Sequence, residues 1–134
     1  MAQLILISHG DFCCGLKRSV EMILGAQPDI SAIDLHEGEA PEEFEKRLLK
    51  VIKPDVHFTI FTDILGGTPY NVAYRLLLSH KYNFELYTGM NLPMLISYLN
   101  GQLVKENANL VHDAKAGIKQ ISANLVEDDN DESF

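Results

Sequence analysis

The sequence predicts an α/β fold, with a doubly wound, mostly parallel sheet of four strands in the order 2-1-3-4 and helices on both faces. Apolar and β-branched runs alternate along the chain with segments of helical periodicity, a pattern that indicates successive strand–helix units. The connections between these segments are short, which favours parallel strands with the helices packed on the sheet. Polar residues and glycines follow the first and third apolar runs, as is typical of the ligand-binding edge of such sheets.

The first half of the chain contains two strand–helix pairs. Residues 3–7 (QLILI) form a continuous apolar run that predicts a buried strand, and apolar residues at helical spacing then continue up to Gly25. Residues 30–35 (ISAIDL) predict the second strand. Pro41 and the two glutamates after it form a favourable first helical turn, although Ala40 is a weak N-cap. A second helix is therefore expected from Pro41 onward.

The second half repeats this pattern. Residues 56–62 (VHFTIFT) predict the third strand, and the GGTP stretch that follows opens a third helix. Residues 83–88 (NFELYT) predict the fourth strand, and residues 93–99 begin a further helical region. The spacing of apolar residues over 107–122 predicts a last helix, which Gly117 could end early.

The length and composition are those of one globular domain. The chain has 134 residues, of which 46% are hydrophobic, which is enough to bury one core. We expect this domain to occupy residues 1–125. The acidic tail over 126–134 is expected to be disordered, because it has too few large apolar residues to offset the entropy of ordering.

The charge and the cysteines exclude several classes of protein. A formal net charge of -8 argues against nucleic acid and anionic membranes as partners and permits attraction to a basic protein. No apolar run approaches the ~20 residues that span a bilayer, and the first residues lack the basic region of a secretory signal. Cys13 and Cys14 are adjacent, too close for an ordinary disulfide, and are expected as free thiols. A cytoplasmic protein is therefore expected.

Chemistry-bearing residues follow two strands that are neighbours in the predicted order. His9 ends the first strand, and Asp63 and a glycine-rich loop follow the third. The carboxyl ends of parallel strands share one edge, so an imidazole, a carboxylate and this loop are expected in one crevice. Taken singly, each has an ordinary explanation: a surface histidine, a turn-forming aspartate, and Thr68 as a helix cap before Pro69.

Taken together, these residues favour phosphoryl transfer at His9. A carboxylate at Asp63 that accepts from one imidazole nitrogen fixes the tautomer and leaves the other nitrogen as a nucleophile. Backbone amides of a glycine-rich loop at a helix N-terminus bind phosphoryl oxygens, and the Thr68 hydroxyl adds a donor. The glycines expected to bind the phosphoryl group are Gly10, Gly66 and Gly67.

Other phosphate-handling motifs do not match. Residues 10–15 are followed by Leu16, which breaks the spacing of a nucleotide P-loop. Neither cysteine has the spacing to Arg18 that a cysteine phosphatase loop requires, and Ser8 stands where a histidine phosphatase has an arginine. The remaining histidines lack the spacing of zinc ligands, so we expect no metal and no cofactor.

Three stretches carry a resemblance to a known family: SHG at residues 8–10, DILGGTPYN at 63–71 and GMNLPM at 89–94. With GL at 15–16 and the SVEMILG stretch at 19–25, they resemble the enzyme IIA component of the mannose-type bacterial phosphotransferase system. The resemblance extends over nearly the whole chain up to Ser122.

This resemblance implies a phosphotransferase that carries a phosphoryl group between proteins. His9 would accept it on Nε2 from the phosphocarrier HPr and pass it to a histidine of a IIB component during phosphoenolpyruvate-dependent sugar uptake. Asp63 would orient the imidazole through Nδ1, and Thr68 would lie at the phosphoryl site. The membrane components IIC and IID would be partners only indirectly, without membrane insertion of this chain.

The resemblance also implies a homodimer in which a short C-terminal strand adds antiparallel to the partner's sheet. In this sequence the strand would lie near residues 118–122, within the segment whose periodicity predicts helix. The two expectations conflict, and both remain open at this point.

Apolar residues on the rim are candidates for contact with a protein partner. Phe12, Leu65 and Met90 are expected to form a modest patch beside the nucleophile, which suits a reversible transfer complex better than a deep pocket does. The stretch over residues 89–93 follows the fourth strand. It either shapes this docking surface or opens a helix with Asn91 as its cap.

Three classes of function remain at this stage. The first is a phosphocarrier subunit of a sugar uptake system. The second keeps the phosphohistidine but serves dihydroxyacetone kinase, whose phosphotransfer subunit has a similar N-terminal domain. The third is a non-catalytic regulatory module of the same fold, as in some transcriptional activators.

Overall fold

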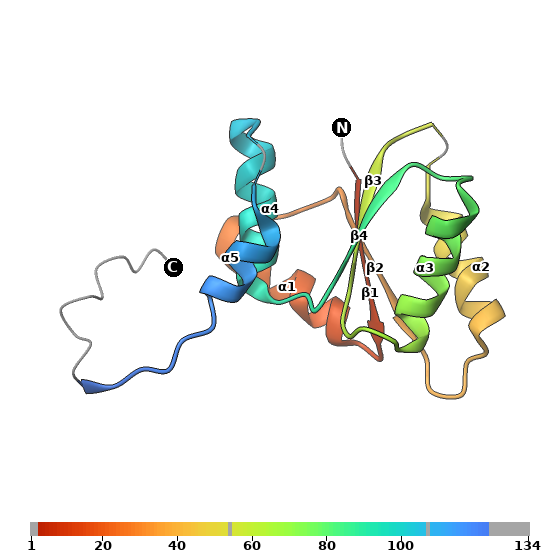
Figure 1. The fold of residues 1–134 in the computed structure, drawn as a ribbon, viewed down its shortest axis with the longest axis horizontal. Coiled ribbons are helices and arrows are strands. Elements are labelled where there is room, and N and C mark those ends of the chain that lie inside the picture. The colour runs from red at the N-terminus through yellow and green to blue at the C-terminus, as the bar shows by residue number, and fades with distance from the viewer. Residues whose placement is uncertain (1–2, 54, 107, 124–134) are drawn as a thin grey trace. The chain divides into compact units, whose positions relative to one another are not determined.

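The computed structural model describes residues 3–53, 55–106 and 108–123. Within these residues, four strands and five helices follow one another in the expected alternation (Figure 1). The strands are β1 (Gln3–His9), β2 (Ile30–Leu35), β3 (Phe58–Thr62) and β4 (Phe84–Thr88). The helices are α1 (Phe12–Leu24), α2 (Pro41–Val51), α3 (Thr68–Ser79), α4 (Leu92–Val104) and α5 (Leu110–Ala116). None of these helices is long and apolar enough to cross a membrane.

The strands pair in the order β2-β1-β3-β4, and all three pairings are parallel. The predicted order and direction are therefore confirmed. β1 lies inside the sheet and is buried from Gln3 to Ser8, as expected for a strand covered on both faces. It extends two residues past the predicted end, because Ser8 and His9 still pair with Asp34 and Leu35 of β2. The carboxyl ends of β1 and β3 lie side by side at one edge.

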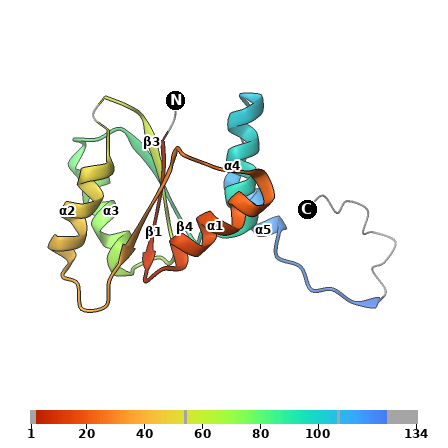
Figure 2. The same ribbon diagram turned by 180° about the vertical axis from the view of Figure 1, so that it is seen from behind.

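Helices cover both faces of the sheet. Figure 1 shows α2 and α3 on one side of the sheet and α1 on the other, and Figure 2 shows the same layers from behind. The core between the sheet and the α2–α3 layer contains Ile5, Ile7, Phe44, Leu48, Ile52, Phe58, Ile60, Val72, Ala73, Leu76 and Phe84. Alternate residues of a strand point to opposite faces, so Leu4 and Leu6 are buried on the α1 side.

The chain divides into two compact units, Met1–Leu92 and Pro93–Phe134. In the second unit, the Asn109 side chain caps α5 by accepting from the amide of His112. The amide of Gly117 bonds back to Asp113 and Ala114 and closes the last turn.

The predicted helix over residues 107–122 is therefore wrong in its extent: α5 covers only Leu110–Ala116, and residues 118–122 are neither helix nor strand. A side chain at Gly117 would collide with the ring of Pro93, so this turn depends on a contact distant in sequence. Residue 107 and the predicted acidic tail over 126–134 lie outside the described residues.

An ion pair organises the connection between β2 and α2. Glu39 accepts from Arg47 through both carboxylate oxygens, at 2.9 Å from Nε and 2.8 Å from Nη2. It also accepts from the backbone amide of His36 at 2.9 Å, and Arg47 donates to the carbonyl of Asp34. The donors from Arg47 and then His36 lower the pKa of Glu39 to about 2.

The weak N-cap at Ala40 is compensated from within the helix. The carboxylate of Glu43 accepts from the amide of Ala40 at 3.2 Å, which is one half of a capping box. Ala40 has no side-chain oxygen to supply the other half, so the β2–α2 turn depends more heavily on the Glu39–Arg47 pair.

We predict that Glu39→Gln lowers the free energy of unfolding at neutral pH by about 1–2 kcal/mol, because a charge-assisted bidentate bond is lost. The folded-state pKa of Glu39 is depressed from 4.5 to about 2, so its contribution is present above the ordinary value and disappears as pH falls toward 2. Urea unfolding at pH 7, 5 and 3 should therefore show a smaller acid-dependent loss in the variant. Glu42→Gln, an exposed carboxylate in the first turn of α2, is the control. Equal acid-dependent losses in the wild type and Glu39→Gln would contradict the prediction.

Candidate functional site

The last residue of β1 is His9, and the chain turns immediately after it. The His9 side chain is 50% exposed at the carboxyl edge of the sheet. Gly10 adopts a positive φ of 57°, a conformation that glycine reaches at little cost. The turn leads directly into α1, so the imidazole stands at an open strand end.

Asp63 holds His9 by two hydrogen bonds to one carboxylate oxygen. The Oδ2 atom accepts from the backbone amide of His9 at 2.8 Å and lies 2.7 Å from Nδ1 of the ring. The other oxygen, Oδ1, accepts from the amide of Ile64 at 2.8 Å. A carboxylate has no proton to donate, so Nδ1 carries the hydrogen. Nε2 therefore keeps the free lone pair, which makes it the nucleophilic atom.

The hydrogen bonds also keep Asp63 ionised. Burial of the carboxylate acts to raise its pKa, but the bonds from the His9 backbone, the His9 ring and the Ile64 amide together outweigh burial, and the pKa lies below its ordinary value of 3.8. This interaction consequently stabilises the fold above that pH and is lost as pH falls through the lowered pKa.

The glycine-rich loop lies against the reactive edge of the imidazole. A Cβ placed on Gly67 would lie 2.5 Å from Cε1 and 3.1 Å from Nε2 of His9. Gly66 has a positive φ of 86°, and Gly67 is the N-cap of α3. Thr68 is thus the first helical residue, not the cap, which corrects the simpler interpretation of this residue.

The N-terminus of α3 lies beside Nε2 of His9, since its N-cap residue Gly67 faces this edge of the ring. The first backbone bond of the helix runs from the amide of Asn71 to the carbonyl of Gly67 at 2.8 Å. Amides earlier in the helix have no carbonyl one turn back to bond. They lie at the positive end of the helix dipole, where phosphate-like groups are favoured.

Two of the expected site residues are placed differently from the prediction. The amide of Gly10 donates to the carbonyl of Leu35 at 2.9 Å, so Gly10 supplies the turn and its amide is not available to a phosphoryl group. Met90 is only 4% exposed, which contradicts its role as a surface contact. Phe12, which follows His9 closely in the sequence, is 51% exposed, and Leu65, in the loop after Asp63, is 67% exposed. Both side chains are therefore accessible, as expected.

Ser8 has a role that the sequence did not reveal. Its buried hydroxyl donates to the carbonyl of Gly10 at 2.9 Å and accepts from the amide of Cys13 at 2.8 Å. It thereby caps α1, whereas the N-cap residue Asp11 makes no side-chain cap bond. A usual cap lies two or three residues before the amide it binds. Ser8 lies five residues before Cys13, so its role as a cap can be recognised only in the folded turn.

The two cysteines are free, as predicted. Burial raises the pKa of Cys13 to about 12, so at neutral pH this residue is a protonated thiol packed in the core. Among the described residues there is also no group of three or more histidine, cysteine and acidic side chains placed to hold a metal ion.

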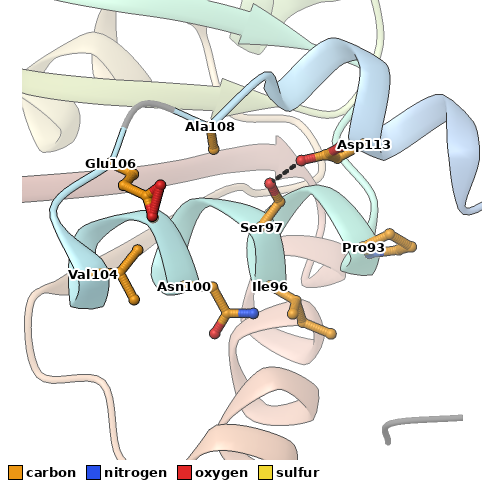
Figure 3. A pocket seen from close by; sticks show the side chains of 9 residues that line it. Pro93, Ile96, Ser97, Asn100, Val104, Glu106, Ala108 and Asp113 are labelled. Carbon is orange, nitrogen blue, oxygen red and sulfur yellow. Dashed lines mark hydrogen bonds between the residues drawn. The ribbon is translucent and has the colours of Figure 1, made fainter. Parts of the chain in front are cut away.

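A hollow in the second unit lies between α4 and the segment that leads into α5 (Figure 3). Across it the Ser97 hydroxyl donates to Asp113 at 2.6 Å. This bond, followed by one from His112, lowers the pKa of Asp113. None of the predicted catalytic or phosphoryl-binding residues lines this hollow.

Comparison with known proteins identifies relatives over most of the chain. A family model described as "PTS system fructose IIA component" matches residues 3–127. The fructose-specific EIIA component of Bacillus subtilis (strain 168) is 33% identical over 103 residues, which are 75% of this chain and 70% of that protein. The sorbose-specific EIIA component of Lacticaseibacillus casei is 33% identical over 96 residues, 70% of this chain and 69% of that protein. The crystal structure of the phosphotransferase system component EIIA from Streptococcus agalactiae has a TM-score of 0.81 and 25% identity, with 90% of this chain and 97% of that one covered.

We predict that Gly67→Ala displaces the His9 ring and leaves the rest of the fold intact. The backbone of Gly67 (φ -79°, ψ 171°) is open to alanine, but the added methyl would meet Cε1 at 2.5 Å. The ring signals of His9 should shift in NMR spectra, and the rate at which diethyl pyrocarbonate modifies Nε2 should change, because the methyl group would stand against the Cε1–Nε2 edge.

Gly15→Ala is the matched control, since its Cβ would meet only the tip of Arg18 at 3.8 Å. An unchanged His9 signal and modification rate in Gly67→Ala would show that the ring does not depend on this contact.

Proposed function

Because the chain belongs to the mannose-type family of phosphotransferase system IIA components, we propose that it carries a phosphoryl group on Nε2 of His9. The donor is the phosphocarrier HPr, and the acceptor is a IIB component of a sugar uptake system. The observation that carries this proposal is the bond between Nδ1 of His9 and Asp63, which leaves Nε2 unprotonated and exposed at a helix N-terminus.

The reaction is an in-line transfer between two protein histidines. The lone pair of His9 Nε2 attacks phosphorus; the new N–P bond forms as the P–N bond to the donor imidazole breaks, and that bond's electron pair returns to the donor nitrogen. The hydrogen bond to Asp63 keeps the proton on Nδ1 of His9. The carboxylate also stabilises the positive charge that develops on the imidazole as the N–P bond forms. Transfer to IIB repeats the same step with His9 as the leaving group.

The phosphoryl oxygens are stabilised by the first turn of α3. Gly67, the N-cap of α3, contacts the Cε1–Nε2 edge of His9. Thr68 and Tyr70 carry the backbone N–H groups of this turn, because Pro69 has none, and we assign the Thr68 hydroxyl as a further donor. Fixed donors of this kind stabilise transferred phosphoryl groups without solvent reorganisation. We assign Gly66 and Gly67 to shaping this loop and assign no cofactor to the reaction.

The surface beside His9 suits a protein partner. Ile64 and Leu65 of the Asp63 loop and Phe12 at the start of α1 are exposed apolar side chains, a small patch of the kind that transient complexes bury. The formal net charge of -8 favours a basic face on the partner. We assign Phe12 and Leu65 to docking of both HPr and IIB, in the cytoplasm.

The C-terminal segment supports a homodimer. Residues 118–122 form no helix or strand, and Ile118 and Ile121 are exposed. β4 is an edge strand of the sheet, with backbone groups available for pairing. We propose that residues 118–122 form a strand that pairs antiparallel with the edge of the partner's sheet. The phosphocarrier domain as a whole is proposed to comprise residues 1–125.

We predict that incubation with phosphoenolpyruvate, enzyme I and HPr labels the wild-type protein with one acid-labile phosphoryl group and that His9→Ala abolishes the label. His112→Ala, which removes an exposed histidine of the second unit, should be labelled as the wild type is. Radiolabelled phosphoenolpyruvate and gel autoradiography provide the measurement. An unlabelled wild-type protein would reject the proposal.

We predict that Asp63→Asn slows this labelling by at least tenfold. The amide oxygen of asparagine could accept from both groups of His9, but its NH₂ would then face the amide of Ile64, which now donates to Oδ1. Either orientation leaves a donor unpaired, at a cost of about 1–3 kcal/mol.

Asp113→Asn, which changes a hydrogen-bonded carboxylate in the second unit, is the control for Asp63→Asn. Initial rates of label incorporation compare the variants. A wild-type rate in Asp63→Asn would mean that the carboxylate does not orient His9.

A further inference from the structure

Asn71 makes two hydrogen bonds to the glycine loop that faces His9. Its side-chain Nδ2 donates to the carbonyl of Gly66 at 3.2 Å, and its backbone amide donates to the carbonyl of Gly67 at 2.8 Å. One residue in the first turn of α3 therefore holds two consecutive carbonyls of the loop. The helical amide bond is available to any residue at this position, but the bond to Gly66 requires a side-chain donor of this length.

The orientation of these carbonyls determines the orientation of the loop amides. In a trans peptide the C=O and N–H groups point in opposite directions. With both glycine carbonyls directed at Asn71, the amides of Gly67 and Thr68 are directed away from it, that of Gly67 toward the carbonyl of Ile64. Gly67 itself contacts the Cε1–Nε2 edge of His9. The first-turn amides are thus presented at the end of α3 where the ring stands.

The loop has little conformational restraint of its own. Gly66 has a φ of 86°, and the residue after it is also glycine. A peptide between two glycines rotates at low steric cost, because neither residue has a Cβ. The turn bond from the amide of Gly67 to the carbonyl of Ile64 is long, at 3.5 Å, and contributes little.

We propose that Asn71 is a positioning residue for phosphoryl transfer. Its side chain holds the Gly66–Gly67 peptide in the orientation that directs the Gly66 carbonyl oxygen toward α3 and away from the phosphoryl group on Nε2. Rotation of this peptide would release the Gly66 carbonyl oxygen from Asn71 and allow it to face the phosphoryl oxygens, which it repels. The inference rests on the proposed function of His9 and extends it to a residue that does not touch the phosphoryl group.

Two variants separate the hydrogen bond from the shape of the side chain. Asn71→Ala removes the donor. Asn71→Asp retains nearly the same shape but places a carboxylate oxygen against the carbonyl of Gly66 and adds a negative charge near the transferred group. Asn109→Ala is the matched control, because Asn109 also bonds a helix N-terminus but lies in the second unit.

The rate measurement uses two phosphoryl donors. One is HPr with enzyme I and phosphoenolpyruvate. The other is phosphoramidate, whose P–N bond breaks and releases ammonia as the His9 Nε2–P bond forms. Loss of one neutral hydrogen bond predicts a roughly five- to tenfold slower reaction of Asn71→Ala with both donors. Asn71→Asp should be slower still, and Asn109→Ala should react as the wild type does.

NMR relaxation dispersion of the Gly66, Gly67 and Thr68 amides provides a second measurement that needs no phosphorylation. Asn71→Ala should show new exchange on the μs–ms timescale at these amides, and the wild type should not. A rate within about twofold of the wild type, or the absence of new exchange in Asn71→Ala, would overturn the proposal. If the wild type is not phosphorylated by HPr, the proposed function fails, but the exchange measurement still tests the role of Asn71.

Discussion

The hydrogen bond between His9 and Asp63 is the interaction on which the site depends. The two residues are 54 positions apart in sequence and meet only because β1 and β3 are adjacent parallel strands whose carboxyl ends share an edge. The carboxylate binds both the backbone and the ring of His9. One side chain therefore fixes the strand end, the ring orientation and the tautomer together. Any change in the pairing of β1 with β3 would separate the imidazole from the group that determines its chemistry.

The site combines an exposed reactive ring with a largely buried partner. The His9 side chain is 50% exposed, whereas that of Asp63 is 14% exposed. A nucleophile that reacts with another protein cannot lie in a closed pocket, so the surroundings restrain its ring less than a core would. Bonds to the backbone and to Asp63, together with the contact of Gly67 on the opposite edge, supply that restraint. Both features follow from one requirement: the ring must be accessible to another protein and must also keep a fixed orientation.

The parts of the structure that depend on periodicity and topology could be predicted from the sequence. The four strands, their order and the placement of His9 and Asp63 at strand ends follow from apolar patterning and from the rule for parallel sheets. The errors concern features that depend on contacts distant in sequence. The end of α5 depends on the approach of Gly117 to Pro93, and the amide of Gly10 is taken by Leu35 of a neighbouring strand. Ser8 caps α1 from outside the usual spacing, and the burial of Met90 is a property of the folded chain alone.

The glycines of the 63–71 stretch show why a motif can be recognised before its mechanism is understood. Gly66 is required by its positive φ and Gly67 by the space that the His9 ring occupies, so each excludes a side chain for a different reason. Two adjacent glycines also make the loop deformable, which conflicts with the fixed donors that phosphoryl transfer requires. A nearby polar side chain must then supply the rigidity that the glycines lack. Asn71 is placed to do this from the first turn of α3, where the helix itself holds its backbone.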